Sequence, residues 1–145
     1  MRLTTFSDYT LRVLMYLAVN TEGRSTIRGI ARSYAISENH LTKIVHHLAK
    51  LGIVESIRGK GGGIRLALSP EKIRIGQVLR ESESGTPIVE CFSPDNKCKI
   101  TASCKLAKIL KRSFDSFYQY LDQYTLADLV STPKTTGDLM RLIGD

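Results

Sequence analysis

The segment that most constrains the fold is ISENHLTKIVHHLAKLGIVESIRGKGGGIRLAL, residues 36–68, where a capped amphipathic helix is followed at once by a glycine-rich hairpin. Ser37 is a good N-cap, and Ile36 before it can pack on Leu41 as a hydrophobic staple. Gly52 provides a stop, so the pattern predicts a helix over residues 38–51. Its apolar stripe consists of Leu41, Ile44, Leu48 and Leu51.

Two further helices are expected before this segment. From Ser7 to Val19 apolar residues recur at helical spacing, and Gly23 is expected to stop this helix. The second helix lies in STIRGIARSYA, residues 25–35, capped by Ser25 or Thr26. A tight turn joins it to the helix over residues 38–51, and two short helices joined in this way form a helix-turn-helix.

The residues after Gly52 predict a β-hairpin wing. Residues 53–58 and 64–68 are strand-like, and the stretch between them is nearly all glycine. A nucleotide phosphate loop is excluded, because GKGGG neither opens a helix nor ends in Gly-Lys-Ser/Thr. A helix-turn-helix followed by a basic hairpin is a winged helix, whose second motif helix lies in the major groove of DNA. The tip combines cations with glycines that allow close approach to phosphate: Arg58, Gly59, Lys60, Gly61, Gly62, Gly63 and Arg65.

The formal net charge of +7 is confined to the first half of the chain. Residues 1–75 contain twelve Lys or Arg against five Asp or Glu, whereas residues 76–145 contain nine of each. Positive charge on one half predicts a polyanionic partner and places the surface that meets it on the winged helix. We therefore expect double-stranded DNA as a partner.

The second half begins with a short helix over IGQVLRESE, residues 75–83, and then enters a loop that holds every cysteine. Residues 105–124 follow with an apolar stripe about 30 Å long at the usual helical rise, which favours a dimer interface over packing on the same domain. Thr125 and Asp128 have capping-box spacing for a last short helix. After Pro133 we expect a tail that is weakly ordered or held by a partner.

Together these patterns predict a mainly α-helical fold with a small β-hairpin. Residues 1–75 form the winged helix-turn-helix DNA-binding part. Residues 76–145 hold the cysteine loop (86–105), a long dimerisation helix (105–124), a short C-terminal helix and the tail, and we expect one compact chain.

The loop contains Cys91, Cys98 and Cys104, separated by six and then five residues. Zinc sites usually bring cysteines in closer pairs, and the histidines all fall on the predicted DNA-reading helix. Thiolates also select iron-sulfur clusters, which are wide enough to be ringed by a loop with these gaps. Spacing alone favours a cluster but leaves zinc, redox-active thiols and buried thiols open.

We expect a cytoplasmic protein. The first residues lack the pattern of a signal peptide, and no run approaches the roughly 18 apolar residues of a membrane span. In a reducing compartment a lasting disulfide is not expected, so the thiols are free, metal-bound or redox-active.

The chain resembles the iron-sulfur winged-helix family of transcription regulators in five segments that cover nearly its whole length: MRLTTFSDYTLRVLMYLA, ISENHLTKIVHHLAKLGIVESIRGKGGGIRLA, IRIGQVLRESE, CKITASCKL and YTLADLV. The cysteine spacing with ITASC resembles the nitric-oxide-sensing branch. The cluster-homeostasis branch instead has a ligating histidine where this chain has Ala107. The resemblance implies a homodimeric repressor of a palindromic operator, with nitric oxide as its signal. It also implies one cluster per subunit, [4Fe-4S] with [2Fe-2S] as the alternative, held by Cys91, Cys98 and Cys104.

The resemblance further implies that Asp8 is a fourth ligand, reaching the cluster from the partner subunit. From the residues alone, an acidic side chain in a first turn more commonly complements the positive end of the helix. A carboxylate is a hard ligand on a soft site, so nitric oxide could displace it. Arg12, one turn later, could then pair with the freed carboxylate as a switch, or it could face solvent or phosphate.

DNA contacts are expected from two regions. The start of the helix over residues 38–51 should reach base edges, with Asn39 suited to adenine and Lys43 to guanine. The base-reading set is Ser37, Asn39, His40, Thr42 and Lys43. The phosphate-contacting set is Arg28, Arg58, Lys60 and Arg65, with Gly61 and Gly62 in the wing.

Three classes of function follow. The first is a cluster-bearing repressor that responds to nitric oxide, with a cluster-homeostasis or redox-responsive regulator as its near alternative. The second is a cluster-bearing electron carrier, for which the basic half and the wing have no use. The third is a winged-helix regulator with zinc or bare thiols. No catalytic nucleophile and base can be assigned, so we do not expect an enzyme.

Overall fold

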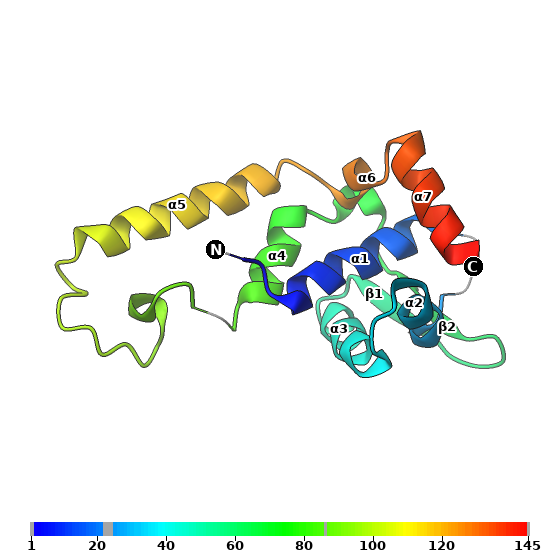
Figure 1. The fold of residues 1–145 in the computed structure, drawn as a ribbon, viewed down its shortest axis with the longest axis horizontal. Coiled ribbons are helices and arrows are strands. Elements are labelled where there is room, and N and C mark those ends of the chain that lie inside the picture. Colours follow the sequence, from blue (N-terminus) through cyan, green and yellow to red (C-terminus); the bar gives the residue numbers. More distant parts are fainter. Residues whose placement is uncertain (1, 22–24, 86, 145) are drawn as a thin grey trace.

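The first helix, α1 (Thr5–Val19), runs through the centre of the molecule and contacts elements from both halves of the chain (Figure 1). The computed structural model describes residues 2–21, 25–85 and 87–144. Thr4 caps α1 by accepting a hydrogen bond from the Ser7 N–H, so the helix begins two residues before the predicted start. It ends at Val19, and the stop expected at Gly23 lies outside the described residues.

The predicted helix-turn-helix is confirmed as α2 (Ile27–Tyr34) and α3 (Glu38–Lys50). Ser37 caps α3 as expected, by accepting the His40 N–H at 3.2 Å. Ala35 turns the chain between the two helices with a φ of 53°, a left-handed conformation that is uncommon for a residue with a Cβ. Gly52, with a φ of 70°, follows α3 and ends it, as predicted.

The wing is confirmed as an antiparallel hairpin of β1 (Val54–Ile57) and β2 (Gly63–Leu66). Its tip depends on glycine at two positions for different reasons. Gly59 has a φ of 100°, which side chains rarely adopt. A Cβ at Gly62 would lie 2.3 Å from the backbone oxygen of Ile57, so the turn leaves no room for a side chain.

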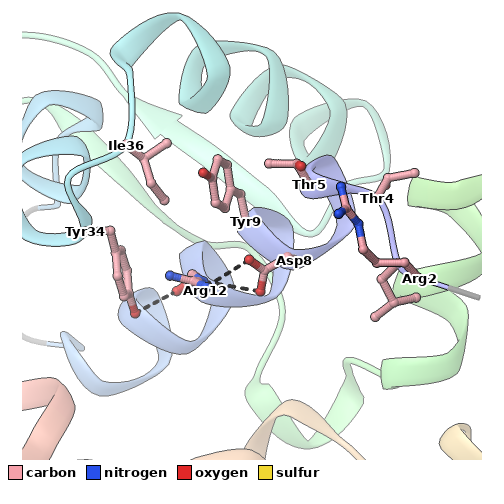
Figure 2. Close-up of a pocket in the computed structure, with 9 residues that line it drawn as sticks. Arg2, Thr4, Thr5, Asp8, Tyr9, Arg12, Tyr34 and Ile36 are labelled. Atoms are coloured by element: carbon pink, nitrogen blue, oxygen red, sulfur yellow. Dashed lines mark hydrogen bonds and ion pairs between the residues drawn. The ribbon is translucent and has the colours of Figure 1, made fainter.

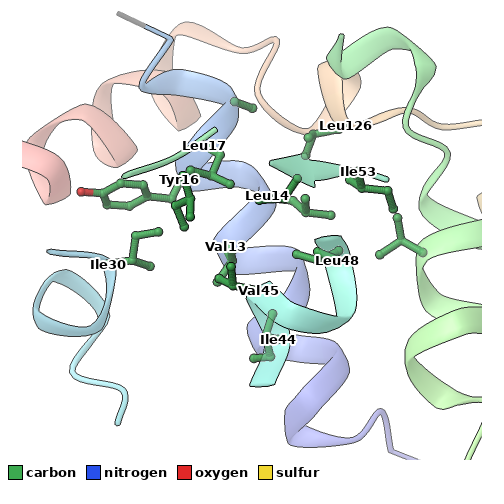
Figure 3. Close-up of a cluster of buried hydrophobic side chains, with 14 of the residues drawn as sticks. Val13, Leu14, Tyr16, Leu17, Ile30, Ile44, Val45, Leu48, Ile53 and Leu126 are labelled. Atoms are coloured by element: carbon green, nitrogen blue, oxygen red, sulfur yellow. The ribbon is translucent and has the colours of Figure 1, made fainter. Parts of the chain in front are cut away.

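The second half adds helices to the same core. α4 (Ile75–Glu83) has the predicted bounds, and α6 (Leu126–Leu129) begins with the predicted capping box of Thr125 and Asp128. A short 3-10 turn, η1 (Pro70–Lys72), leads into α4. Both α4 and α6 contact α1, so one core joins them to the winged helix. The most deeply buried apolar side chains include Val13, Leu14, Ile30, Leu41, Ile44, Leu48, Val78 and Leu126, and Figure 3 shows several of them around α1.

The tail expected after Pro133 is instead a helix, α7 (Pro133–Gly144), that contacts α1 and α2. Proline often follows the end of a helix, but it also fits the first position of a helix, where its missing N–H would have no partner, and Pro133 takes that position in α7. Thr132 supports this start by accepting the Thr135 N–H at 3.2 Å. The tail prediction is therefore wrong, and Ile143 packs against the core.

The predicted long helix is α5 (Lys105–Leu121), which ends three residues before the predicted bound. Figure 1 shows α5 projecting from the core as an arm, with the cysteine loop at its far end and the 3-10 turn η2 (Glu90–Phe92) in that loop. No residue of α5 is fully buried. The chain is therefore less compact than expected, because the apolar side of α5 has little cover within the described part of the chain.

The base of this arm is held firmly on α4. Arg80 forms an ion pair with Asp122, and its guanidinium lies 5.2 Å from the centroid of the Tyr118 ring. The Asp122 partner raises the pKa of Arg80 further above its ordinary value. A Cβ at Gly76 would lie 2.4 Å from the Tyr118 carbonyl oxygen, so only glycine allows this close approach of the two helices. Among the described residues, no helix is long and apolar enough to cross a bilayer.

Candidate functional site

The exposed side of α3 carries the predicted base-reading residues. All four of those within the helix are exposed: Asn39, His40, Thr42 and Lys43. The opposite side is buried in the core through Leu41, Ile44, Val45 and Leu48. The Thr42 hydroxyl donates to the Glu38 carbonyl at 2.8 Å, and the Ser37 hydroxyl is the α3 cap. Both hydroxyls therefore have roles within the helix, while the longer side chains of Asn39 and Lys43 extend from its first turns.

The predicted phosphate-contacting cations are exposed as well: Arg28, Arg58, Lys60 and Arg65. Two of them are paired with carboxylates, Arg28 with Glu38 at 3.3 Å and Arg65 with Glu55 at 2.6 Å. Exposed ion pairs contribute only about 0–1 kcal/mol, so a DNA phosphate can replace either carboxylate at little cost. Gly61 lies at the wing tip with a φ of 79°.

Asp8 lies on the first turns of α1 beside a cavity of about 530 Å³ (Figure 2). Its carboxylate makes a two-point ion pair with Arg12, with Oδ2 to Nη2 at 2.9 Å and Oδ1 to Nε at 3.2 Å. Both side chains are nearly half exposed. Asp8 is thus accessible to a partner from the cavity side, and its present partner is the residue predicted to act as a switch.

Two tyrosines extend this arrangement toward the helix-turn-helix. The Arg12 guanidinium lies 5.7 Å from the centroid of the Tyr9 ring, and the Tyr9 ring lies 6.2 Å from that of His40 on α3. The Tyr34 hydroxyl donates to the Arg12 carbonyl at 3.2 Å. Burial raises the pKa of Tyr34 to about 12, although the nearby Arg12 charge works to lower it. Contacts therefore run from Asp8 through Arg12 and Tyr9 to His40.

All three cysteines are free thiols. Cys91 lies in η2 and Cys104 is the N-cap residue of α5, both partly buried, whereas Cys98 is exposed between them. Asn96 braces this loop, because its Oδ1 accepts the Cys98 N–H and its Nδ2 donates to the Thr101 hydroxyl, each at 2.8 Å.

The donor set suits a soft metal centre, since three thiols on one loop are the ligands that iron-sulfur clusters and zinc prefer. Within the described residues, however, no three His, Cys, Asp or Glu side chains converge to hold a metal ion. Figure 1 places the start of α1 away from the far end of α5, so Asp8 is not gathered with the cysteines of its own chain. The residue types fit a cluster chemically, but the described part of this single chain does not bring them together.

Sequence reasoning missed three contributors to this region: Tyr9, Asn96 and Glu83. Tyr9 follows Asp8 directly, and its helical position could have placed it beside Arg12. Asn96 lies two residues before a cysteine, a spacing at which an Asn side chain often accepts a backbone N–H. Glu83, which hydrogen-bonds Thr4, gives no local signal because the two residues are 79 positions apart.

Comparisons with known proteins agree with this picture. Residues 3–132 match a family model described as Rrf2, iron-dependent transcriptional regulator. The chain is 47% identical over 145 residues to the HTH-type transcriptional regulator NsrR of Bacillus subtilis, covering 99% of this chain and 97% of that protein.

Two solved structures share the fold. IscR of T. potens has a TM-score of 0.71 and 27% sequence identity, with 90% of this chain and 87% of that chain covered. CymR, the global cysteine regulator of B. subtilis, has a TM-score of 0.70 and 32% identity, with 90% of this chain and 97% of that chain covered. The winged-helix interpretation of the fold is therefore confirmed by both sequence and structural similarity.

Proposed function

Because this chain belongs to the Rrf2 family of transcription regulators and is not an enzyme, we propose that it is a homodimeric, cytoplasmic repressor that senses nitric oxide through an iron-sulfur cluster. The observation that carries the proposal is the loop of three free thiols on a winged-helix chain with an exposed basic side. Reaction of the cluster lowers affinity for a palindromic operator.

Cys91, Cys98 and Cys104 of one subunit hold the cluster, and Asp8 of the partner subunit completes its ligands. When bound, the cluster supplies iron atoms with which nitric oxide reacts, and we favour [4Fe-4S] over [2Fe-2S]. Three thiolates and one carboxylate would give each iron of a [4Fe-4S] cluster one protein ligand. The iron on the carboxylate would be held less firmly than the other three, because a hard oxygen ligand suits this soft centre less well. The separation of Asp8 from the thiols of its own chain supports a ligand contributed across the dimer.

Arg12 and Tyr9 carry the signal toward DNA. An Asp8 carboxylate released from its ligand role can form the two-point ion pair with Arg12. Arg12 also lies over the Tyr9 ring, and Tyr9 contacts His40 on α3. A change in the partner of Asp8 therefore alters the packing of α1 against α3. Such a rearrangement is a two-state element biased by a ligand.

In the bound state α3 lies in the major groove and the wing contacts the flanking backbone. Asn39 and Lys43 read base edges together with Ser37, His40 and Thr42. Arg28, Arg58, Lys60 and Arg65 contact phosphates, and Gly61 and Gly62 let the wing backbone approach.

Specific features of the sequence disfavour two alternatives. A cluster-homeostasis or redox-responsive regulator is disfavoured by Ala107, which cannot supply a ligand where that branch has a histidine. A zinc or bare-thiol regulator is disfavoured by the wide spacing of the cysteines.

The decisive experiment is an absorption spectrum of protein purified without oxygen, followed by operator binding with and without nitric oxide. We expect brown protein with broad charge-transfer absorption, and operator binding that falls as nitric oxide is added. Colourless protein that binds DNA would favour the zinc or thiol regulator. Brown protein without salt-sensitive binding of palindromic DNA would favour an electron carrier.

A further inference from the structure

The last residue of α4, Glu83, anchors the start of α1 across a separation of 79 residues. Its Oε1 accepts the backbone N–H of Thr4 at 2.8 Å and the Thr4 hydroxyl at 2.9 Å. Thr4 is the N-cap of α1, so one carboxylate holds the residue that sets the direction of the helix.

Thr4 is in turn bonded to the residues that follow it. Its carbonyl accepts the backbone N–H of Asp8 at 3.0 Å, and its hydroxyl oxygen accepts the Ser7 N–H at 3.2 Å. The backbone of Asp8 is therefore two hydrogen bonds away from Glu83.

A second contact joins the same two turns. The hydroxyl oxygens of Ser7 and Ser82 are 2.8 Å apart, and Ser7 is completely buried. The last turn of α4 thus holds the first turn of α1 at two points, which leaves the intervening residues little freedom to rotate.

Glu83 also stands where the cysteine loop departs from α4. It lines an apolar cavity of about 340 Å³ between the N-terminal segment and α5, together with Leu3, Phe114, Phe117 and Tyr118. Burial works to raise the pKa of Glu83, but hydrogen bonds from Ser7 and Thr4 together hold this pKa below its ordinary value. The Glu83 carboxylate is therefore ionised at neutral pH.

We infer that Glu83 is a positioning residue that sets the first turn of α1 and so fixes the direction in which Asp8 reaches the cluster of the partner subunit. This inference rests on the proposed function, in which Asp8 is a ligand. Partners that orient a metal ligand are commonly worth about 10–100-fold in metal affinity or activity, although they never touch the metal.

The test compares four full-length variants with wild type: Glu83→Ala, Glu83→Gln, Glu81→Ala and Asp8→Ala. Glutamine keeps a carbonyl that can accept both Thr4 hydrogen bonds, so Glu83→Gln should restore most of what Glu83→Ala loses. Glu81 is an exposed carboxylate two residues earlier on α4, and its alanine variant controls for loss of charge. Backbone amide exchange in the apo protein gives a readout that needs no cluster, while the cluster spectrum and operator affinity report on Asp8.

In Glu83→Ala, amide exchange at Thr4, Ser7 and Asp8 should accelerate at least about ten-fold, since a bond to a charged group is lost. Its cluster spectrum should shift in the same direction as that of Asp8→Ala, and operator affinity should fall about ten-fold. Glu81→Ala should match wild type in all three measurements, and Glu83→Gln, which keeps the acceptor but loses the charge, should lie closer to wild type than to Glu83→Ala.

Wild-type exchange and spectrum in Glu83→Ala would overturn the inference, as would failure of Glu83→Gln to rescue. If Glu83→Ala does not fold, Glu83→Asp decides, because the shorter side chain keeps the charge but withdraws the carboxylate from Thr4. Faster exchange at Thr4 with a shifted spectrum would support the positioning role, and wild-type values of both would overturn it. An unchanged spectrum in Asp8→Ala would instead refute the proposed ligand. A shift in Asp8→Ala without one in Glu83→Ala would refute the positioning role alone.

Discussion

At the scale of single residues, Asp8 has two possible roles, as a helix-start residue and as a cluster ligand, and its position on α1 allows both. As an acidic residue in a first turn it interacts with the positive end of the helix and pairs with Arg12. As a ligand it would exchange that partner for iron. The two roles differ in what removal of the carboxylate should change.

Asp8→Ala should leave the protein coloured, because three thiolates still hold a cluster, while the spectrum, the nitric-oxide titration and operator affinity all shift. If Asp8 acts only at the start of the helix, Asp8→Ala should lower the free energy of unfolding by up to about 1 kcal/mol and leave the spectrum unchanged. Asp115→Ala is the matched control, because it also removes an exposed carboxylate paired four residues away, with Lys111 at 3.0 Å. Agreement of Asp8→Ala with wild type in all three measurements would leave Asp8 as a helix-start residue.

Asn39 and Lys60 should differ in the kind of DNA binding they support. Asn39→Ala should relax discrimination at one base pair by about 1–3 kcal/mol, since a bidentate amide contact is lost. Lys60→Ala should weaken binding to all sequences alike and lower the dependence on salt concentration. Binding titrations on operator and scrambled DNA at two salt concentrations distinguish them. An equal loss on both DNAs for Asn39→Ala would contradict its assignment to base reading.

At the scale of elements, the junction of α4 and α5 determines where the cysteine loop stands relative to the core. Gly76 permits the close contact, Arg80 pairs with Asp122, and Arg74 donates to the Asp122 carbonyl at 3.3 Å. The projecting arm is therefore attached at its base by specific polar contacts and one required glycine, while its length is left uncovered.

Gly76→Ala should destabilise the protein by about 1–3 kcal/mol, the usual cost of forcing extra atoms into a packed contact. The added Cβ would meet the Tyr118 carbonyl oxygen and the Asp122 carboxylate, each at 2.4 Å. Gly137→Ala on α7 is the control, because a Cβ there meets nothing within 4 Å and alanine favours a helix by up to about 1 kcal/mol. Chemical denaturation measures both, and equal stability of the two variants would show that the junction tolerates a side chain.

At the scale of the whole molecule, the exposed apolar side of α5 is the surface through which the proposed dimer would form. Leu106 is 61% exposed and Ile109 is 51% exposed, values that are high for large aliphatic residues on a folded helix. A second copy that covers this side would bury them and carry the cysteine loop toward the partner's core.

Ile109→Glu should shift the protein from dimer to monomer and, with it, abolish cooperative binding to the palindromic operator. Gln119→Glu is the matched control, because it adds the same charge at an exposed position on α5 away from the apolar stripe. Sedimentation analysis over a range of concentrations measures the change. A dimer that persists in Ile109→Glu would place the interface elsewhere.

Much of the fold could be predicted because its signals are local. Ser37 and Gly52 mark the ends of α3 by capping chemistry, and α4 has the bounds that its apolar spacing indicates. The prediction of a tail after Pro133 was wrong because proline is common both after helices and at their first position, and only the packing of α7 on α1 distinguishes the two cases. The Glu83–Thr4 contact was beyond prediction, since nothing local to either residue indicates the other.

The separation of Asp8 from the cysteine loop has a genetic consequence. If each site draws its ligands from two gene products, alleles carrying Asp8→Ala and Cys98→Ala should complement each other. In a mixed dimer, the intact thiols of the Asp8→Ala chain meet the intact aspartate of the Cys98→Ala chain, so one complete site forms, while the other site lacks both groups. Mixed dimers isolated with two affinity tags should therefore regain the wild-type spectrum at half its intensity, whereas ligands drawn from a single chain would leave no complete site at all.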